Sequence, residues 1–152
     1  MLYVSGLYAL NLSCSLDTCG DWHHGALNWK NVLFLESADL PWGNKGIEHN
    51  RLIPRHNECY NVANHIRALL DLIFLGDFAS AQGMRHDFID NEKYTLEIFK
   101  AIEVLKNHEN WEIISQFMLK EYKLDWYYYL HPVNNGEKYG HFRHYIFNAE
   151  RK

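Results

Sequence analysis

Residues 13–25, SCSLDTCGDWHHG, concentrate the side-chain types that most often carry chemistry. Two cysteines, two aspartates and two adjacent histidines occur within this stretch. Thiolates and imidazoles are zinc ligands, whereas a carboxylate beside an imidazole orients the ring and raises its pKa, as proton transfer requires. The stretch therefore offers two kinds of chemistry, a structural metal site or a proton-transfer surface.

The metal site is the less favoured of the two. A structural zinc ion is usually held by two close pairs of thiolate or imidazole ligands that the fold brings together. No second close pair of cysteines accompanies Cys14 and Cys19, because Cys59 is isolated, and nothing in the sequence requires His23 or His24 to complete a ligand set. We therefore predict no metal ion and no other cofactor.

The alternative interpretation makes CGDWHHG a fixed loop. Gly20 permits a tight backbone turn, Asp21 can accept hydrogen bonds from amides, and Trp22 can anchor the loop by inserting into the core. Such a loop presents one histidine outward and one inward, although a loop histidine most often meets only solvent or a backbone carbonyl. We predict Asp21, His23 and His24 as candidate catalytic residues and Trp22 as a binding residue.

A second polar group lies in GMRHDF, residues 83–88. Arg85 and Asp87 are two positions apart, so in an extended loop they lie on one side and can pair or receive an anionic group. We predict Arg85 and Asp87 as further candidate catalytic residues. Arg67 and Asp71, four positions apart on a predicted helix, are instead expected to form a surface ion pair of little energetic weight.

A third group consists of amides on one face of a predicted helix. Asn57, Asn61 and Asn64 share this face, and His65 adjoins it. A helix face that merely meets water usually carries Glu and Lys, so these amides either hydrogen-bond a loop such as residues 20–25 or line a polar cleft. We favour the loop contact, and we predict all four residues as binding residues.

The elements that must position these groups suggest an α+β fold. We predict a helix-dominated single domain over residues 1–152 with three to four helices. Residues 1–55 form an irregular N-terminal part with short strands, residues 56–123 the helical core, and residues 124–152 a C-terminal aromatic β-hairpin that turns at Asn135-Gly136. Apolar periodicity predicts helices over residues 57–75 with Gly76 at the end, 77–82 with Gly83 at the end, about 91–107, and from Asn110 onward.

Composition narrows the classes of function. Of 152 residues, 15 are basic and 19 acidic, a net charge of -4, so nucleic-acid binding is not indicated by net charge. No apolar run approaches the length of a membrane span. An odd number of cysteines, three, fits reduced thiols better than a secreted disulfide framework, and we predict a cytoplasmic location.

Two functions remain open. The first is a protein-binding or regulatory module, with a protein partner or a homodimer, because 15% of the residues are aromatic and some of these rings are expected at a surface. A small acidic domain rich in Trp and Asn resembles bacterial proteins of genomic islands and of antitoxin or phage-defence neighbourhoods. The alternative is a small hydrolase or nuclease with a histidine general base, supported by Asp21 and Arg85.

Overall fold

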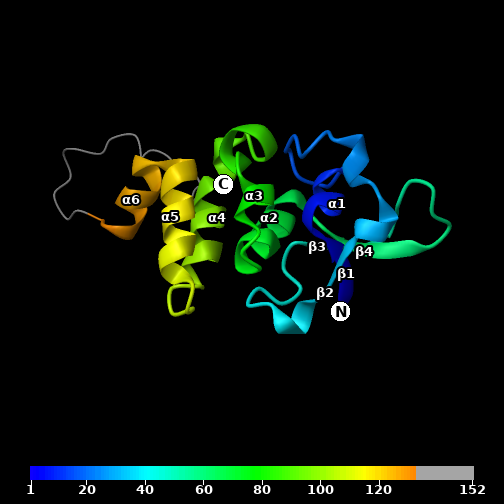
Figure 1. The fold of residues 1–152 in the computed structure, drawn as a ribbon, viewed down its shortest axis with the longest axis horizontal. Coiled ribbons are helices and arrows are strands. Elements are labelled where there is room, and N and C mark those ends of the chain that lie inside the picture. Colours follow the sequence, from blue (N-terminus) through cyan, green and yellow to red (C-terminus); the bar gives the residue numbers. More distant parts are fainter. Residues whose placement is uncertain (133–152) are drawn as a thin grey trace. The chain divides into compact units, whose positions relative to one another are not determined.

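The computed structural model describes residues 1–132, with only the backbone described at His24 (Figure 1). The chain divides into two compact units, Met1–Asp90 and Asn91–Lys152. The first unit combines a sheet with helices, and the described part of the second is helical.

A four-stranded sheet in the order β2-β1-β4-β3 organises the first unit. Its strands are β1 (Leu2–Ser5), β2 (Leu33–Glu36), β3 (Ile47–Leu52) and β4 (Cys59–Ala63). The central strand β1 is antiparallel to β2 and parallel to β4, while β3 and β4 are antiparallel with an irregular register between Glu48 and Arg51. The sheet is therefore mixed, and Figure 1 shows β4 running directly into the helix that follows it.

Two α-helices pack with this sheet. Helix α1 (Gly6–Leu10) follows β1 directly, and α2 (His65–Phe74) contacts α1, β1 and β4. Asn64 caps α2, because its side-chain oxygen accepts a hydrogen bond from the Arg67 amide at 2.8 Å. This cap fixes where the helix begins and therefore where His65 lies.

Short helical segments complete the first unit. They are η1 (His24–Ala26), η2 (Trp29–Asn31), η3 (Ser37–Asp39), α3 (Phe78–Ala81) and the π-helix η4 (Met84–Phe88). The ring of Trp29 in η2 lies 5.4 Å from Tyr8, 5.5 Å from Phe34 and 5.0 Å from Tyr60, measured between centroids. These edge-to-face contacts join the segment before β2 to α1 and to the sheet.

A buried polar network holds α2 on β1. The Asp71 carboxylate accepts hydrogen bonds from Tyr3 at 2.8 Å, from Ser5 at 2.6 Å and from Arg67 at 2.8 Å. Arg67 also donates to the carbonyl of Gly43 at 2.7 Å. Both charged side chains are almost completely buried, so the prediction of a surface ion pair between Arg67 and Asp71 is wrong.

The second unit contains η5 (Glu92–Tyr94), α4 (Thr95–Glu103), α5 (Trp111–Tyr122) and α6 (Leu124–Leu130). Phe99 on α4 contacts Tyr122 at 5.0 Å and Trp126 at 5.1 Å between ring centroids, and the Trp126 indole donates to Ser115 at 3.1 Å. Trp126, which belongs to α6, therefore packs against α4 and α5.

The predicted fold class is wrong in three respects. Residues 1–55 contribute three strands of an ordered mixed sheet, where an irregular segment with short strands was expected. The described chain contains six α-helices and a π-helix, more than the three to four predicted. Residues 124–130 form α6, which replaces the first strand of the predicted C-terminal hairpin, and the rest of that hairpin lies outside the described residues.

The individual helix predictions fared unevenly. Helix was predicted over residues 57–75, but residues 59–63 form β4 and the helix begins only at His65. The end of that helix was predicted correctly, since Gly76 follows the C-cap with a φ of 80°. Helices near residues 77–82, 91–107 and after Asn110 are all present.

Candidate functional site

A cavity of about 170 Å³ lies where the end of α1, the loop after it and the start of α2 meet. Its walls are formed by Leu10, Asn11, Leu12, Ser13, Cys14, Thr18, Cys19, Asp21, Trp22 and His65. Every wall residue except His65 therefore comes from α1 or from the loop that contains the opening cysteine- and histidine-rich stretch. Side chains of that stretch and His65 of α2 therefore line the same cavity.

Three of these side chains form a continuous polar chain. The Cys14 Sγ lies 3.6 Å from the Thr18 Oγ1, and the Thr18 Oγ1 lies 2.7 Å from the His65 Nδ1. On the other side of the ring, His65 Nε2 is 2.6 Å from the carbonyl oxygen of Leu12. Because a carbonyl oxygen only accepts, Nε2 carries a proton, and Nδ1 is the nitrogen that faces the Thr18 hydroxyl.

The surroundings of Cys14 favour its thiolate form. Partial burial alone would raise the pKa of the thiol, but hydrogen bonds from the His65 ring, from the backbone amides of His65 and Leu16, and from Thr18 outweigh it and lower the pKa to about 7. The His65 amide belongs to the first turn of α2, whose N-terminal end favours negative charge. The thiolate is therefore a well-populated form of Cys14 at neutral pH.

His65 responds in the complementary direction. Burial alone would lower the pKa of its imidazole, since the residue is only 2% exposed. Hydrogen bonds with Cys14 and with the Leu12 carbonyl, together with the charges of Cys14 and Glu48, raise the pKa above its ordinary value instead. Cys14 and His65 thus stabilise each other as a thiolate and an imidazolium.

The loop reaches this geometry through Gly20. Gly20 has a φ of 71° and donates its amide to the Phe88 carbonyl, while Asp21 donates its amide to the Leu10 carbonyl at 2.8 Å. A Cβ placed on Gly20 would lie 2.6 Å from Cε1 of His65. Glycine is therefore required both for the backbone conformation and for the close approach of the loop to the imidazole.

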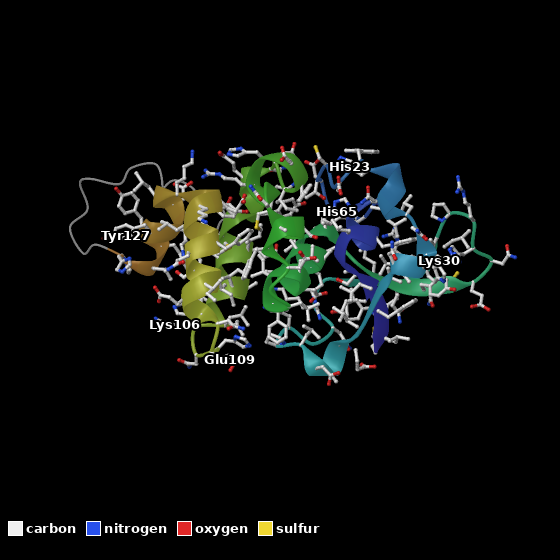
Figure 2. All side chains as sticks on the ribbon, in the orientation of Figure 1. His23, Lys30, His65, Lys106, Glu109 and Tyr127 are labelled. Atoms are coloured by element: carbon white, nitrogen blue, oxygen red, sulfur yellow. The ribbon has the colours of Figure 1, made fainter. Side chains whose placement is uncertain are left out.

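Asp21 and His23 are brought together, as the sequence suggested. The Asp21 carboxylate pairs with Nδ1 of His23, and the Asn11 side chain bonds both the Asp21 carboxylate at 3.3 Å and the His23 amide at 2.8 Å. Asp21 lines the cavity, whereas the His23 side chain is 83% exposed and lies at the surface, with His65 further inside (Figure 2). The side chain of His24 lies outside what the structure describes.

Trp22 adopts the opposite position from the one expected. It is 82% exposed and stands at the wall of the cavity, so the prediction that it inserts into the core is wrong. The loop is instead fixed by hydrogen bonds of Gly20, Asp21 and Asn11. Because Trp22 is exposed, it stays a candidate binding residue.

Arg85 and Asp87 are not part of the cavity wall. Both belong to η4, where the Asp87 amide donates to the Gly83 carbonyl at 2.8 Å, so the segment is helical and the expected extended loop is absent there. Phe88, at the end of η4, accepts the Gly20 amide and joins this segment to the loop. Convergence of Arg85 with the loop stays a prediction.

The predicted amide face is distributed over several elements. Asn57 lies exposed in a bend, Asn61 lies on β4 and bonds the Leu2 carbonyl at 3.2 Å, and Asn64 caps α2. Of this group, His65 reaches the loop. Its ring bonds Thr18 and the Leu12 carbonyl, whereas the loop contact was expected from the amides and for a loop such as residues 20–25.

The sequence interpretation missed Cys14 and Thr18 as chemical partners of His65. Cys14 was considered only as a metal ligand, and Thr18 was not considered. Within residues 1–132, no group of three or more His, Cys, Asp or Glu side chains is placed to hold a metal ion. The sequence carried only a weak signal for this contact. Cys14 follows a short apolar segment, and His65 directly follows Asn64, which can cap a helix.

Comparisons with known proteins add no functional information. No protein-family model, curated protein or solved structure matches this chain. Among the helices of the described residues, none has the length and apolar character needed to cross a membrane.

Proposed function

We propose that the protein is a thiol-dependent enzyme in which Cys14 is the nucleophile, His65 the acid and base, and Thr18 the group that relays the proton between them. The observation that carries this proposal is the unbroken chain from Cys14 Sγ through Thr18 Oγ1 to His65 Nδ1 at the wall of an open cavity. A nucleophilic cysteine requires such a base within reach and a group that orients the base.

The relay accounts for both protonation states. In the neutral state the Cys14 thiol donates to Thr18, whose hydroxyl donates to Nδ1. A concerted shift of both protons gives a thiolate that accepts from the Thr18 hydroxyl and an imidazolium whose Nδ1 donates to it. The Leu12 carbonyl keeps the second ring nitrogen protonated in both states, so the ring does not need to turn.

The cavity limits the size of the substrate. Pockets for drug-sized ligands usually measure about 300–1,000 Å³, and this one is smaller, at about 170 Å³. A small electrophile, or one side chain of a larger molecule, fits this space. We include a reducing cytoplasmic setting in the proposal, because Cys14, Cys19 and Cys59 are all free thiols and Cys14 acts only when reduced.

Alkylation kinetics test the proposal directly. Iodoacetamide reacts with thiolates, so the rate at Cys14, followed by peptide mapping, should rise with a midpoint near pH 7. His65→Gln should move this midpoint to about pH 8 or above, toward the value of an ordinary thiol, and Thr18→Val should raise it by a smaller amount. Cys59, which is exposed and outside the cavity wall, provides the internal reference in the same digest.

A wild-type Cys14 midpoint near pH 8.5, or a Cys14 rate at pH 7 below that of Cys59, would contradict the proposal. A midpoint that stays near 7 in both variants would show that Thr18 and His65 do not stabilise the thiolate.

Recognition of a protein partner is a second candidate, and Trp22 is the observation that favours it. An indole that is 82% exposed beside a cavity is the type of side chain that dominates binding energy at interfaces. For a homodimer, sedimentation of the wild type should show concentration-dependent association that Trp22→Ala abolishes. A monomer at every concentration would remove the homodimer from consideration.

A further inference from the structure

A second thiol shares the cavity with Cys14. Cys19 is exposed and free and contributes to the same wall, whereas Cys59 does not. A hydrogen bond to the Asp90 carboxylate raises the pKa of the Cys19 thiol, in contrast to the lowered pKa of Cys14. The two thiols therefore differ in protonation: Cys14 favours the thiolate form, and Cys19 favours the protonated thiol.

The chain between the two cysteines is free of regular structure. Residues 15–17 form bends, and Thr18 also lies outside helix and strand. Ser15 is held at one end by hydrogen bonds to Glu48 at 2.9 Å, and Gly20 is held at the other end by Phe88. The segment that links the two sulfur atoms is therefore short, irregular and outside β1, α1 and α2.

Three hydrogen-bond donors of the loop that could serve an acyl-transfer reaction are already engaged. Acyl transfer requires donors for the oxyanion that develops on a carbonyl substrate. The amides of Gly20 and Asp21 already donate to Phe88 and Leu10, and the Asn11 amide group donates to Asp21 and to a backbone carbonyl. Attack on a peroxide oxygen instead leaves the negative charge on the departing oxygen, and one proton from the Thr18–His65 pair neutralises it.

We propose that the Cys14–Cys19 pair reduces small hydroperoxides, with Cys14 as the attacking thiolate and Cys19 as the thiol that resolves the product to a disulfide. This inference rests on the proposed function, because it requires the nucleophilic Cys14. It adds the substrate class and a role for a second residue.

The reaction balances in two steps. The Cys14 thiolate attacks the terminal oxygen of the hydroperoxide, the O–O bond breaks, and the departing alkoxide or hydroxide takes a proton that His65 delivers through Thr18. Cys14 is now a sulfenic acid. Cys19 then attacks the Cys14 sulfur, the S–O bond breaks, and the Cys19 proton, accepted by the neighbouring Asp90, leaves with the hydroxide as water. An external dithiol reduces the disulfide by exchange.

The experiment uses the full chain, reduced, freed of reductant and mixed with hydrogen peroxide at pH 7. Intact mass should show the loss of two hydrogens, and peptide mapping should find Cys14 linked to Cys19. In Cys19→Ser the reaction should stop at a Cys14 sulfenic acid that dimedone traps. Cys59→Ser is the matched control and should behave as the wild type, while Cys14→Ser should form neither product.

The rate of peroxide consumption separates this inference from the proposed function. Removing the proton donor in His65→Gln should slow the reaction by at least about tenfold. A fast alkylation at Cys14 combined with no Cys14–Cys19 disulfide would overturn the peroxide inference and leave the nucleophilic thiol standing. A slow alkylation with an ordinary pH midpoint would overturn both. A disulfide that involves Cys59, or one that forms between chains, would also overturn the assignment of Cys19.

Discussion

Substitution of Gly20 by alanine tests whether the loop positions His65. The added Cβ would lie 2.6 Å from Cε1 of the ring, 2.9 Å from Nε2 and 2.6 Å from the Leu10 carbonyl oxygen. Contacts this short force either the ring or the backbone to move. Moving the ring breaks its bonds to Leu12 and Thr18, so both the fold and the reactivity of Cys14 should respond.

The expected loss of stability has two parts. Placing a Cβ at a left-handed φ costs about 1–2 kcal/mol, and forcing an extra methyl group into a closely packed site costs about 1–3 kcal/mol more. Gly20→Ala should therefore lower the free energy of unfolding by about 2–5 kcal/mol, measured by urea denaturation. In the folded variant, the pH midpoint of Cys14 alkylation should rise from about 7 toward 8.5.

Gly43→Ala is the matched control. Gly43 also has a positive φ, 51°, but an added Cβ there meets nothing within 4 Å. It should therefore carry the backbone cost of about 1–2 kcal/mol without the steric part, and it should leave the alkylation midpoint of Cys14 unchanged. Equal destabilisation by the two substitutions, or a Cys14 midpoint that stays near 7 in Gly20→Ala, would refute the claim that Gly20 positions His65.

Three further predictions concern other parts of the molecule. Lys123 joins α5 to α6 with φ 54° and ψ −128°, a backbone region that favours glycine, so Lys123→Gly should raise the free energy of unfolding by about 1 kcal/mol and increase Tm in a thermal melt. Folding lowers the pKa of Cys14 from that of an ordinary thiol, about 8.5, to about 7, so its contribution to stability is present in full above about pH 8.5 and is lost as the pH falls through 7. The free energy of unfolding should therefore increase with pH across that range in urea denaturation, and Cys14→Ser should remove this increase. Arg67→Met should destabilise the fold by about 3–5 kcal/mol because it leaves the buried Asp71 carboxylate without its charge partner, and adding Asp71→Leu should recover part of that loss in the same assay.

The helix that ends before Gly76 and the helix that begins after Asn110 could be predicted because their signals are local. Helix α5 begins after Asn110, as expected from the apolar spacing that follows it, and Gly76 ends α2 as a glycine at that position should. Each signal involves residues within one or two turns of each other. Tertiary contacts reinforce these elements without changing their type.

The strand β4 could not be predicted because its apolar spacing imitates a helix. Val62 and Ile66 are four residues apart, which continues the pattern of α2 backward past its true beginning. Asn64 ends that continuation, because it caps the helix and turns the chain into an extended strand. An asparagine inside an apolar pattern has two interpretations, a polar face or a cap, and only pairing of residues 59–63 with β1 and β3 selects the cap.

The candidate site was even less accessible to sequence reasoning, because Cys14 and His65 are joined only by the fold. Three independent constraints act on one imidazole: Asn64 fixes the start of its helix, Gly20 lies close against one edge of the ring, and the Leu12 carbonyl binds Nε2. Two hydrogen bonds would satisfy a merely structural buried histidine, and a glutamine at that position would supply part of them. A glutamine cannot supply the basic ring nitrogen of His65, which contacts the Thr18 hydroxyl, which in turn contacts the Cys14 thiol. The pH dependence of Cys14 in His65→Gln therefore separates a structural histidine from a chemical one, since a structural role would change stability and leave the midpoint where it was.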